Sequence, residues 1–245
     1  MSEHAIDLDF RLDDKVALVT GGASGIGAAI GSALATKGAT IAVADLSDPA
    51  DGGRGFHCNV ADPESVRATV DAVIKAYGRI DILVNSAGIA RLAPAEELSQ
   101  KFWDDTIAVN LTGTFQMCQA VGKHMLTAGG GVIINMASQA ATVAIEEHVA
   151  YCASKFGVVG ITKVLAAEWA GRGVRVNSIS PTVVLTDLGI KAWDNPKGDA
   201  LKKLIPTGRF AYPDEIAAAA VYLASGAAGM VNGADLVIDG GYTIK

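Results

Sequence analysis

Short runs of β-branched and apolar residues alternate with longer stretches of helical composition along this chain. The runs that predict strands are residues 16–19, 40–44, 82–84, 132–135, 174–179 and 236–238, with a weaker seventh run at 55–58. The stretches that predict helices are residues 26–37, 63–77, 102–126, 150–170 and 214–224. Strands and helices that alternate in this way form parallel sheets with crossover helices. We therefore predict an α/β fold, a doubly wound seven-stranded parallel sheet flanked by helices.

The whole chain, residues 1–245, is expected to form one domain, because no repeat and no Pro/Ser-rich linker divides it. Residues 1–12 precede the first strand and are predicted to be a flexible extension. Only residues 46–54 separate the second and third predicted strands, so the crossover there is predicted to have a very short helix or none. Residues 187–206 are polar and contain Asn195-Pro196 and Gly198, which predicts a mobile lid over the site.

Charge and hydropathy exclude several classes of partner. The net charge of −6 would repel a phosphate backbone, so we expect no nucleic-acid partner. The first ten residues lack the basic start and apolar centre of a signal peptide, and Gly, Asp, Asn or Lys interrupts each apolar run before it reaches bilayer length. A cytoplasmic protein without a membrane span is the expectation.

The three cysteines, Cys58, Cys118 and Cys152, have neither a C-x-x-C nor a Cys/His spacing. We expect reduced thiols and no metal site. Apolar residues make up 50% of the chain and charged residues only 19%. This ratio favours an oligomer in which partner subunits cover apolar helix faces.

A glycine-rich turn follows the first predicted strand and opens a helix. It contains Gly21, Ser24, Gly25, Ile26 and Gly27. A strand, glycine turn and helix in this order present backbone N–H groups to a pyrophosphate, as in Rossmann-type dinucleotide sites. The glycines alone are a weak signal, since any tight strand-to-helix turn uses them.

Asp45 strengthens the dinucleotide interpretation. It ends the second predicted strand, where a carboxylate can accept hydrogen bonds from both ribose hydroxyls of the adenosine. The same charge would repel the additional phosphate of NADP. We therefore expect NAD as the cofactor.

Tyr151 and Lys155 lie four residues apart on a predicted helix, and hence on one face of it. A free phenol titrates near ~10, too high for a base at neutral pH. A neighbouring ammonium stabilises the phenolate and makes the tyrosine usable as both acid and base.

The Thr-Gly-x-x-x-Gly-x-Gly spacing of residues 20–27, together with the Tyr151/Lys155 pair, resembles the short-chain dehydrogenase/reductase family over nearly the whole chain. The resemblance implies that Asn85, Ala87 and Gly88 support the adenine side of the cofactor, with Ser86 in place of a second Asn. It also implies that Asn59 and Val60 hold the adenine, although Asn59 replaces an acid.

The same resemblance assigns roles around Tyr151. Ser138 would orient the substrate oxygen, Lys155 would also bind the nicotinamide ribose, and Asn110 would hold a water of a proton relay. Val184 and Thr186 would bind the nicotinamide carboxamide. Thr182 departs from the family pattern, which has a Gly there, so the local turn is left open.

The stretches 85–92, 165–177 and 239–243 look like the polyol dehydrogenases of this family. This implies NAD-dependent oxidation of a small sugar alcohol to a ketose, with D-threitol to D-erythrulose as the first guess. Glu146 and His148, which precede Tyr151, are candidate substrate ligands, with a solvated loop as the alternative.

Two other functions stay open. One is reduction of a 3-ketoacyl thioester or another ketone, although the glycine turn lacks the basic residue that such NADPH enzymes commonly carry. The other is a non-catalytic NAD-binding sensor or scaffold. Relatives in the family pair the helices at 102–126 and 150–170 between subunits, which implies a homotetramer.

Overall fold

The computed structural model describes residues 6–47 and 55–244. The described strands form one parallel sheet in the order β3-β2-β1-β4-β5-β6-β7. The order reverses between β1 and β4, and doubly wound sheets bind ligands at such a switch point, beyond the carboxyl ends of the strands. The predicted seven-stranded doubly wound fold is confirmed.

The strands agree closely with the predicted runs. They are β1 (Val16–Thr20), β2 (Thr40–Asp45), β3 (Gly55–His57), β4 (Ile82–Asn85), β5 (Gly131–Met136), β6 (Val174–Pro181) and β7 (Asp235–Ile238). β1 and β4 are buried throughout, as strands covered on both faces must be. The predicted short crossover at 46–54 lies largely outside the described residues.

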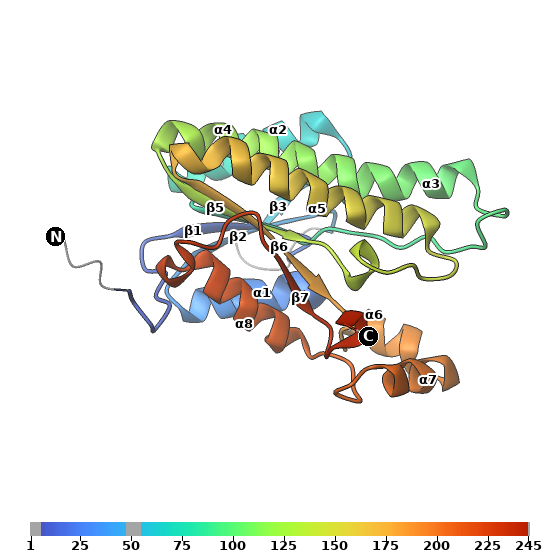
Figure 1. Ribbon diagram of the computed structural model, residues 1–245. Helices are drawn as coiled ribbons and strands as arrows, with labels where there is room; N and C mark the ends of the chain where they lie inside the picture. Colours follow the sequence, from blue (N-terminus) through green and yellow to red (C-terminus); the bar gives the residue numbers. More distant parts are fainter. Residues whose placement is uncertain (1–5, 48–54, 245) are drawn as a thin grey trace.

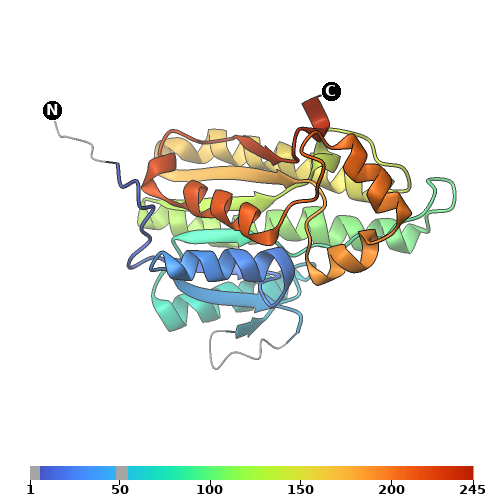
Figure 2. The same cartoon turned by 90° about the horizontal axis from the view of Figure 1, so that it is seen from below.

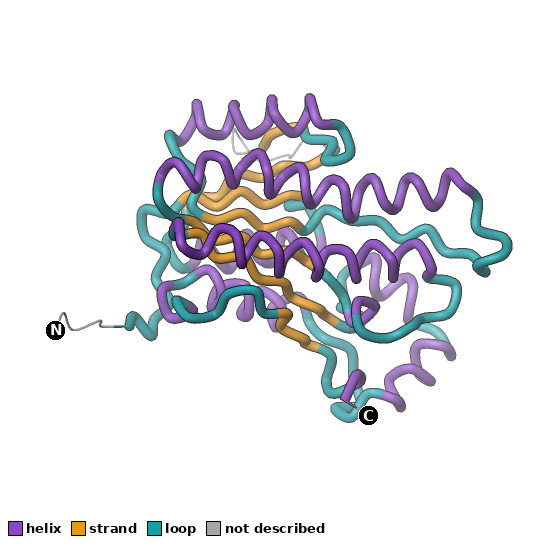
Figure 3. Tube along the Cα trace, turned by 45° about the horizontal axis from the view of Figure 1, so that its top comes forward, coloured by secondary structure: helices purple, strands orange, loops and turns teal. Residues whose placement is uncertain are grey.

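Helices cover both faces of the sheet (Figures 1 and 3). One layer contains α2 (Pro63–Tyr77), α3 (Gln100–Ile107), α4 (Thr114–Ala128) and α5 (Val149–Trp169). The opposite layer contains α1 (Gly25–Thr36) and α8 (Pro213–Ala224), which lie side by side in Figure 2. The two layers enclose two apolar clusters, one on each face of the sheet.

The helix predicted at 102–126 is interrupted. A wide π-helical turn, Ala108–Gly113, separates α3 from α4. Gly113 packs tightly here, because a Cβ would lie 2.9 Å from the Val60 carbonyl oxygen. π-helical turns often mark functional sites, and this one carries Asn110.

The segment predicted as a lid contains two short helices, α6 (Asp187–Trp193) and α7 (Pro196–Leu204). Thr186 caps α6 by accepting from the Gly189 N–H at 3.0 Å, and Asn195 caps α7. The Trp193 ring meets the Phe210 ring edge-on with centroids 6.2 Å apart. These helices lie beyond the carboxyl ends of the strands (Figure 1), and the mobility of the segment stays a prediction.

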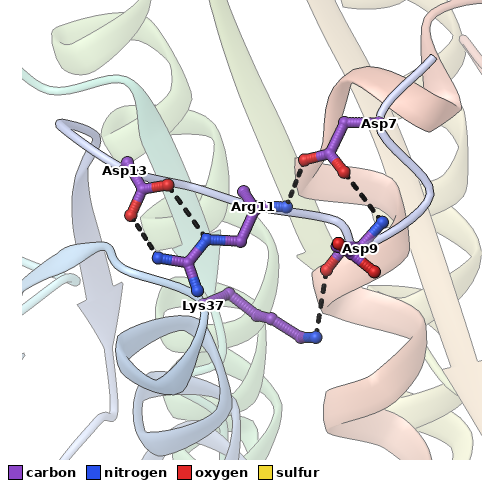
Figure 4. Close-up of polar contacts among 5 residues, drawn as sticks. All are labelled: Asp7, Asp9, Arg11, Asp13 and Lys37. Carbon is purple, nitrogen blue, oxygen red and sulfur yellow. Dashed lines mark hydrogen bonds and ion pairs between the residues drawn. The ribbon is translucent and has the colours of Figure 1, made fainter.

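Polar contacts hold residues 7–12 against the end of α1 (Figure 4). The Asp7 carboxylate accepts from the backbone N–H groups of Asp9 and Arg11, and the Lys37 ammonium donates to the Asp9 carbonyl at 3.0 Å. Leu12 is buried beneath them. Residues 1–5 of the predicted extension lie outside the described part of the chain, and its flexibility stays a prediction.

One helical segment, Val149–Arg172, has the length and mean hydropathy, 1.4, of a membrane span. This segment was not identified from the sequence, because only uninterrupted apolar runs were considered. The single lysines and glycines that interrupt the segment do not lower its mean hydropathy below that of a membrane span. The segment packs on the sheet in the layer described above, with Val158, Thr162 and Leu165 buried. One side of the helix is therefore covered by the sheet, and the cytoplasmic location stays a prediction.

Candidate active site

The turn between β1 and α1 is packed so closely that two of its positions, Gly21 and Gly27, have no room for a side chain. Gly21 has φ +63°, and a Cβ there would lie 2.8 Å from the backbone of Ala87. A Cβ on Gly27 would lie 2.3 Å from the Gly21 carbonyl oxygen. Ser24 precedes the helix, and its side chain makes no capping hydrogen bond within the described residues. The turn thus leaves the N-terminal N–H groups of α1 facing the end of the sheet, which suits a phosphate.

Asp45 lies at the carboxyl end of β2 beside this turn. Its Oδ2 accepts from the Ala23 N–H at 3.1 Å, and its Oδ1 accepts from the Ser47 N–H at 3.1 Å and hydroxyl at 2.9 Å. These contacts fix the carboxylate at the rim of a cleft. The lone pairs that remain can accept from ribose hydroxyls.

The cleft has a volume of about 500 Å³ and runs along the carboxyl ends of the first strands. Most residues predicted to bind the cofactor line it: Gly21, Ser24, Gly25, Ile26, Gly27, Asp45, Asn59, Val60, Ala87, Gly88 and Thr186. A glycine cradle, a helix N-terminus and a fixed carboxylate are the groups that a dinucleotide requires, so the cleft fits one.

Asn59 and Asn85 differ in their placement. Asn59 reaches the cleft, and its Oδ1 already accepts from the Ala61 N–H at 3.1 Å. Asn85 is buried, and its Nδ2 donates to Asn135 Oδ1 at 2.8 Å and to the Cys118 sulfur at 3.2 Å. Its side chain therefore supports the interior beneath the cleft rather than the cleft itself.

Gly88 is the point where the cleft meets the predicted catalytic group. It lines the cleft, and a Cβ there would lie 3.8 Å from the Lys155 Nζ and 3.4 Å from the Asn110 Oδ1. Because Gly88 has no side chain, a molecule in the cleft can approach both groups closely. The structure thus places the cofactor cleft and the Lys155 ammonium next to each other.

Tyr151 and Lys155 lie on one face of α5, with the Lys155 Nζ 5.6 Å from the centre of the Tyr151 ring. Burial raises the pKa of Tyr151, and the nearby Ser138 side chain opposes part of that rise. Burial also lowers the pKa of Lys155 to about 8, and its ammonium donates to the Met136 carbonyl at 2.7 Å. Three predicted catalytic residues, Ser138, Tyr151 and Lys155, are therefore brought together.

Asn110 clamps this arrangement from the π-helical turn. Its Oδ1 accepts from the Ile89 N–H at 2.8 Å, and its Nδ2 donates to the Ile89 carbonyl at 2.9 Å and to the Ser154 hydroxyl at 3.1 Å. Both Nδ2 hydrogens are thereby engaged with protein groups. Asn110 positions the loop after β4 against α5, and its predicted role in holding a water stays a prediction.

The residues predicted to bind the nicotinamide carboxamide follow β6. The Thr186 methyl carbon would lie 3.5 Å from a Cβ on Gly25, so Thr186 faces the glycine turn across the cleft. Val184 is buried and bridges to Ala211 in a short parallel pairing. Thr182 does not have a positive φ. The turn after β6 therefore forms with a threonine at the position where the family pattern has a glycine.

The candidate substrate ligands have different surroundings. The His148 ring meets the Tyr151 ring edge-on with centroids 6.0 Å apart. The His148 Nδ1 lies 2.6 Å from the Glu146 carbonyl oxygen, while the Glu146 side chain is exposed. His148 is thus beside the reacting phenol, whereas Glu146 joins the site here through its backbone.

The sequence reasoning missed several residues that line the cleft. They are Cys58, Ile89, Val109 and Leu188 among others. Apolar side chains carry no chemical signal of their own, and only their places directly after the strands or inside the helices next to the site could have indicated them.

Comparison with known proteins agrees with this geometry. Residues 21–243 match the family model described as enoyl-(acyl carrier protein) reductase. The chain belongs to the short-chain dehydrogenase/reductase family and is an oxidoreductase.

Three relatives are informative. The chain is 73% identical to a D-threitol dehydrogenase of Mycolicibacterium smegmatis, covering 99% of this chain and 98% of that protein. It is 47% identical to an NAD-dependent glycerol dehydrogenase of Listeria innocua, with both chains covered fully. A crystal structure of a gluconate 5-dehydrogenase from Burkholderia cenocepacia in complex with NADP and tartrate has a TM-score of 0.93 at 37% identity, covering 97% and 98% of the two chains.

Proposed function

We propose that this enzyme oxidises a secondary alcohol of a small sugar alcohol to the ketose, with D-threitol to D-erythrulose as the first substrate pair. The proposal rests on one observation. Ser138, Tyr151 and Lys155 lie close together beside Gly88, at the end of the dinucleotide cleft. The 73% identity to a D-threitol dehydrogenase supports the choice of substrate.

The chain's own residues manage the alcohol proton. Ser138 and Tyr151 hold the reacting oxygen between their hydroxyls, and Tyr151 takes the proton as the carbonyl forms. The Lys155 ammonium stabilises the phenolate that makes this possible. A nicotinamide dinucleotide bound in the cleft supplies the acceptor for the hydride of the same carbon.

Steady-state assays test the function directly. Formation of NADH is followed with C3 to C6 polyols, with simple secondary alcohols and 3-ketoacyl thioesters as contrasting substrates. We expect turnover of one or more polyols, with the highest kcat/KM for a four-carbon substrate. Reduction of the thioesters with no polyol turnover would instead identify a ketone reductase.

NAD, rather than NADP, is the cofactor that we propose. The Asp45 carboxylate is fixed at the cleft rim by Ala23 and Ser47, where a 2′-phosphate would meet its negative charge. The proposal distinguishes this chain from the structurally similar gluconate 5-dehydrogenase, which was crystallised with NADP.

Asp45→Asn is expected to lower the ratio of kcat/KM for NAD to kcat/KM for NADP by about tenfold to a hundredfold, which corresponds to about 1.4 to 2.8 kcal/mol. The substitution removes the charge and keeps one acceptor oxygen. Asp187→Asn is the matched control, because Asp187 also lines the cleft but begins α6 near Thr186. Equal effects of the two substitutions on the ratio would contradict a specific role for Asp45.

We further propose that α6 and α7 close over the bound substrate as a lid. Leu188 lines the cleft and is 77% exposed, so an apolar side chain lies at the entrance without full cover. Closure would bury it and exclude water from the reacting carbon.

The assembly that we propose is a homotetramer. Phe156 and Val164 on α5 are 52% and 56% exposed, and Phe115 on the neighbouring helix α4 is 40% exposed. Exposed apolar side chains of this size on neighbouring helices mark an interaction surface. Sedimentation equilibrium is expected to give four times the subunit mass of 25.1 kDa, and Val164→Glu is expected to reduce that mass. A wild-type mass of one subunit would refute the tetramer.

A further inference from the structure

Gln139 directly follows the catalytic Ser138, and its side chain is almost completely enclosed. The residue is 4% exposed, yet its Oε1 has no hydrogen-bond partner among residues 6–47 and 55–244. Buried polar atoms are normally paired, so each unpaired atom needs an explanation. A structural role alone would be served better by an apolar side chain of the same size.

A second buried polar atom lies at the end of the neighbouring strand. Thr182 is 8% exposed, and its Oγ1 also lacks a partner within the described chain. The register of β5 and β6 pairs Met136 with Ile179, and three further residues along each chain lead to Gln139 and Thr182. Gln139 begins the short 3-10 turn Gln139–Ala141 that follows Ser138 and packs against β6, and Thr182 directly follows β6, so both residues lie at the carboxyl ends of these paired strands.

Both backbones are fixed, while the Gln139 Oε1 and the Thr182 Oγ1 stay unpaired within residues 6–47 and 55–244. The Gln139 carbonyl accepts from the N–H groups of Thr142 and Val143, and the Thr182 N–H donates to the Ile238 carbonyl at 3.0 Å. The side chains are therefore held at the carboxyl edge of the sheet. Substrates of doubly wound proteins bind at this edge.

The chemistry of the pair indicates what it binds. A carboxamide and a hydroxyl are neutral, and each offers both a donor and an acceptor. Alcohol hydroxyls match that combination, whereas a carboxylate or phosphate would be matched by Lys or Arg. Ser138 and Tyr151 already hold the reacting oxygen, so a hydroxyl on a neighbouring carbon is the group that remains to be bound.

We propose that Gln139 and Thr182 bind a non-reacting hydroxyl of the polyol and thereby select polyols over simple secondary alcohols. This inference rests on the proposed polyol oxidation. It also gives a reason for a threonine at the position where the family resemblance leads one to expect glycine, because only a side chain supplies the hydroxyl.

The test compares kcat/KM for D-threitol, butane-1,2-diol, butane-2,3-diol and butan-2-ol in wild type, Gln139→Met and Thr182→Val. The first substitution keeps side-chain length, the second keeps side-chain shape, and each removes the hydrogen-bonding group. A site that binds a substrate hydroxyl discriminates strongly against analogues without it. We therefore expect each variant to lower the threitol to butan-2-ol ratio by about tenfold or more, with kcat/KM for butan-2-ol changed by less than about threefold. The diol whose rate falls with threitol identifies the carbon that carries the bound hydroxyl.

Two controls separate binding from structure. Gln116→Met is the matched variant, since the Gln116 Oε1 is likewise buried without a partner in the described residues but lies in the groove between α2 and α4. It is expected to keep the wild-type ratio. Thr182→Ser, which keeps the hydroxyl, is expected to restore most of the discrimination that Thr182→Val loses. Tm of the Gln139→Met variant should not fall, because the Gln139 Oε1 has no partner to lose in the described part of the chain.

The outcomes distinguish this inference from the function on which it rests. If the wild type oxidises no polyol, the proposed function fails and this inference fails with it. If the wild type oxidises threitol but both variants keep the threitol to butan-2-ol ratio within about twofold, or lower both rates equally, the inference alone is overturned.

Discussion

Tyr151→Phe is expected to lower kcat for polyol oxidation by about 10²- to 10⁴-fold, the range that general acid–base catalysis contributes. The substitution removes only the phenol oxygen that takes the alcohol proton. The ring, its edge-on contact with His148 and the position of Lys155 next to it can all remain. The loss should therefore appear in kcat, while the affinity for NADH, measured by fluorescence titration, stays close to that of the wild type.

Tyr77→Phe is the matched control for this experiment. Tyr77 ends α2 and packs edge-on against Phe56 at the opposite end of the sheet order from Tyr151. Its loss of a hydroxyl should leave turnover unchanged. If Tyr151→Phe keeps turnover within about fivefold of the wild type, general catalysis by this phenol is excluded, and a non-catalytic NAD-binding role gains support.

Lys155→Met is expected to lower kcat/KM at pH 7.5 by about 10²- to 10⁴-fold and to change its pH dependence. Because the Tyr151 and Lys155 side chains lie next to each other, we expect them to lose protons as a coupled pair. Burial lowers the pKa of Lys155 to about 8 and raises that of Tyr151. Oxidation needs the form of the pair that has lost one proton, with the phenolate beside the ammonium, so wild-type kcat/KM should rise through about pH 8 and then level off. Without Lys155, the buried phenol alone should titrate at a pH above the ordinary tyrosine value, and the rising part of the profile should move there.

Stability gives an independent check on the same variant. A lysine whose pKa is lower in the folded protein than in the unfolded chain destabilises the fold while it is protonated. Its contribution becomes more favourable as the pH rises from about 8 toward the ordinary lysine value. Lys155→Met should therefore keep or raise Tm at pH 7, and the exposed Lys163→Met on the same helix should alter neither the pH profile nor Tm. A rising limb that stays near pH 8 in the Lys155→Met variant would contradict the coupled pair.

The periodicity of apolar residues predicted the sheet well, because buried parallel strands have one pattern and few alternatives. It failed inside the helix at 102–126, where Asn110 and Gly113 lie in a wide turn stabilised by contacts with Ile89 and Val60. Those partners are distant in sequence, so no local pattern contains them. It also missed α6 and α7, because helices capped by Thr186 and Asn195 look polar and loop-like when only hydropathy is considered.

The candidate site was predictable to the extent that residue type reveals chemistry. Tyr151, Lys155 and Asp45 carry groups whose spacing indicates their purpose, and the family resemblance added Ser138. Gln139 gave no such signal, since a glutamine is identified as unpaired only when every neighbour of its amide is known.

The Asn110 carboxamide forms hydrogen bonds with both the N–H and the carbonyl of Ile89, as a residue of a neighbouring β-strand would. It attaches the loop after β4 to α5, the helix that carries Lys155, while α6 contributes Leu188 to the cleft from a different part of the chain. The entrance of the cleft and the proton-handling residues thus belong to separate segments. Descendants of this scaffold can reshape the entrance by exchanging residues 187–206, while Ser138, Tyr151 and Lys155, together with Gln139 and Thr182 beside them, would pass unchanged from one variant to the next.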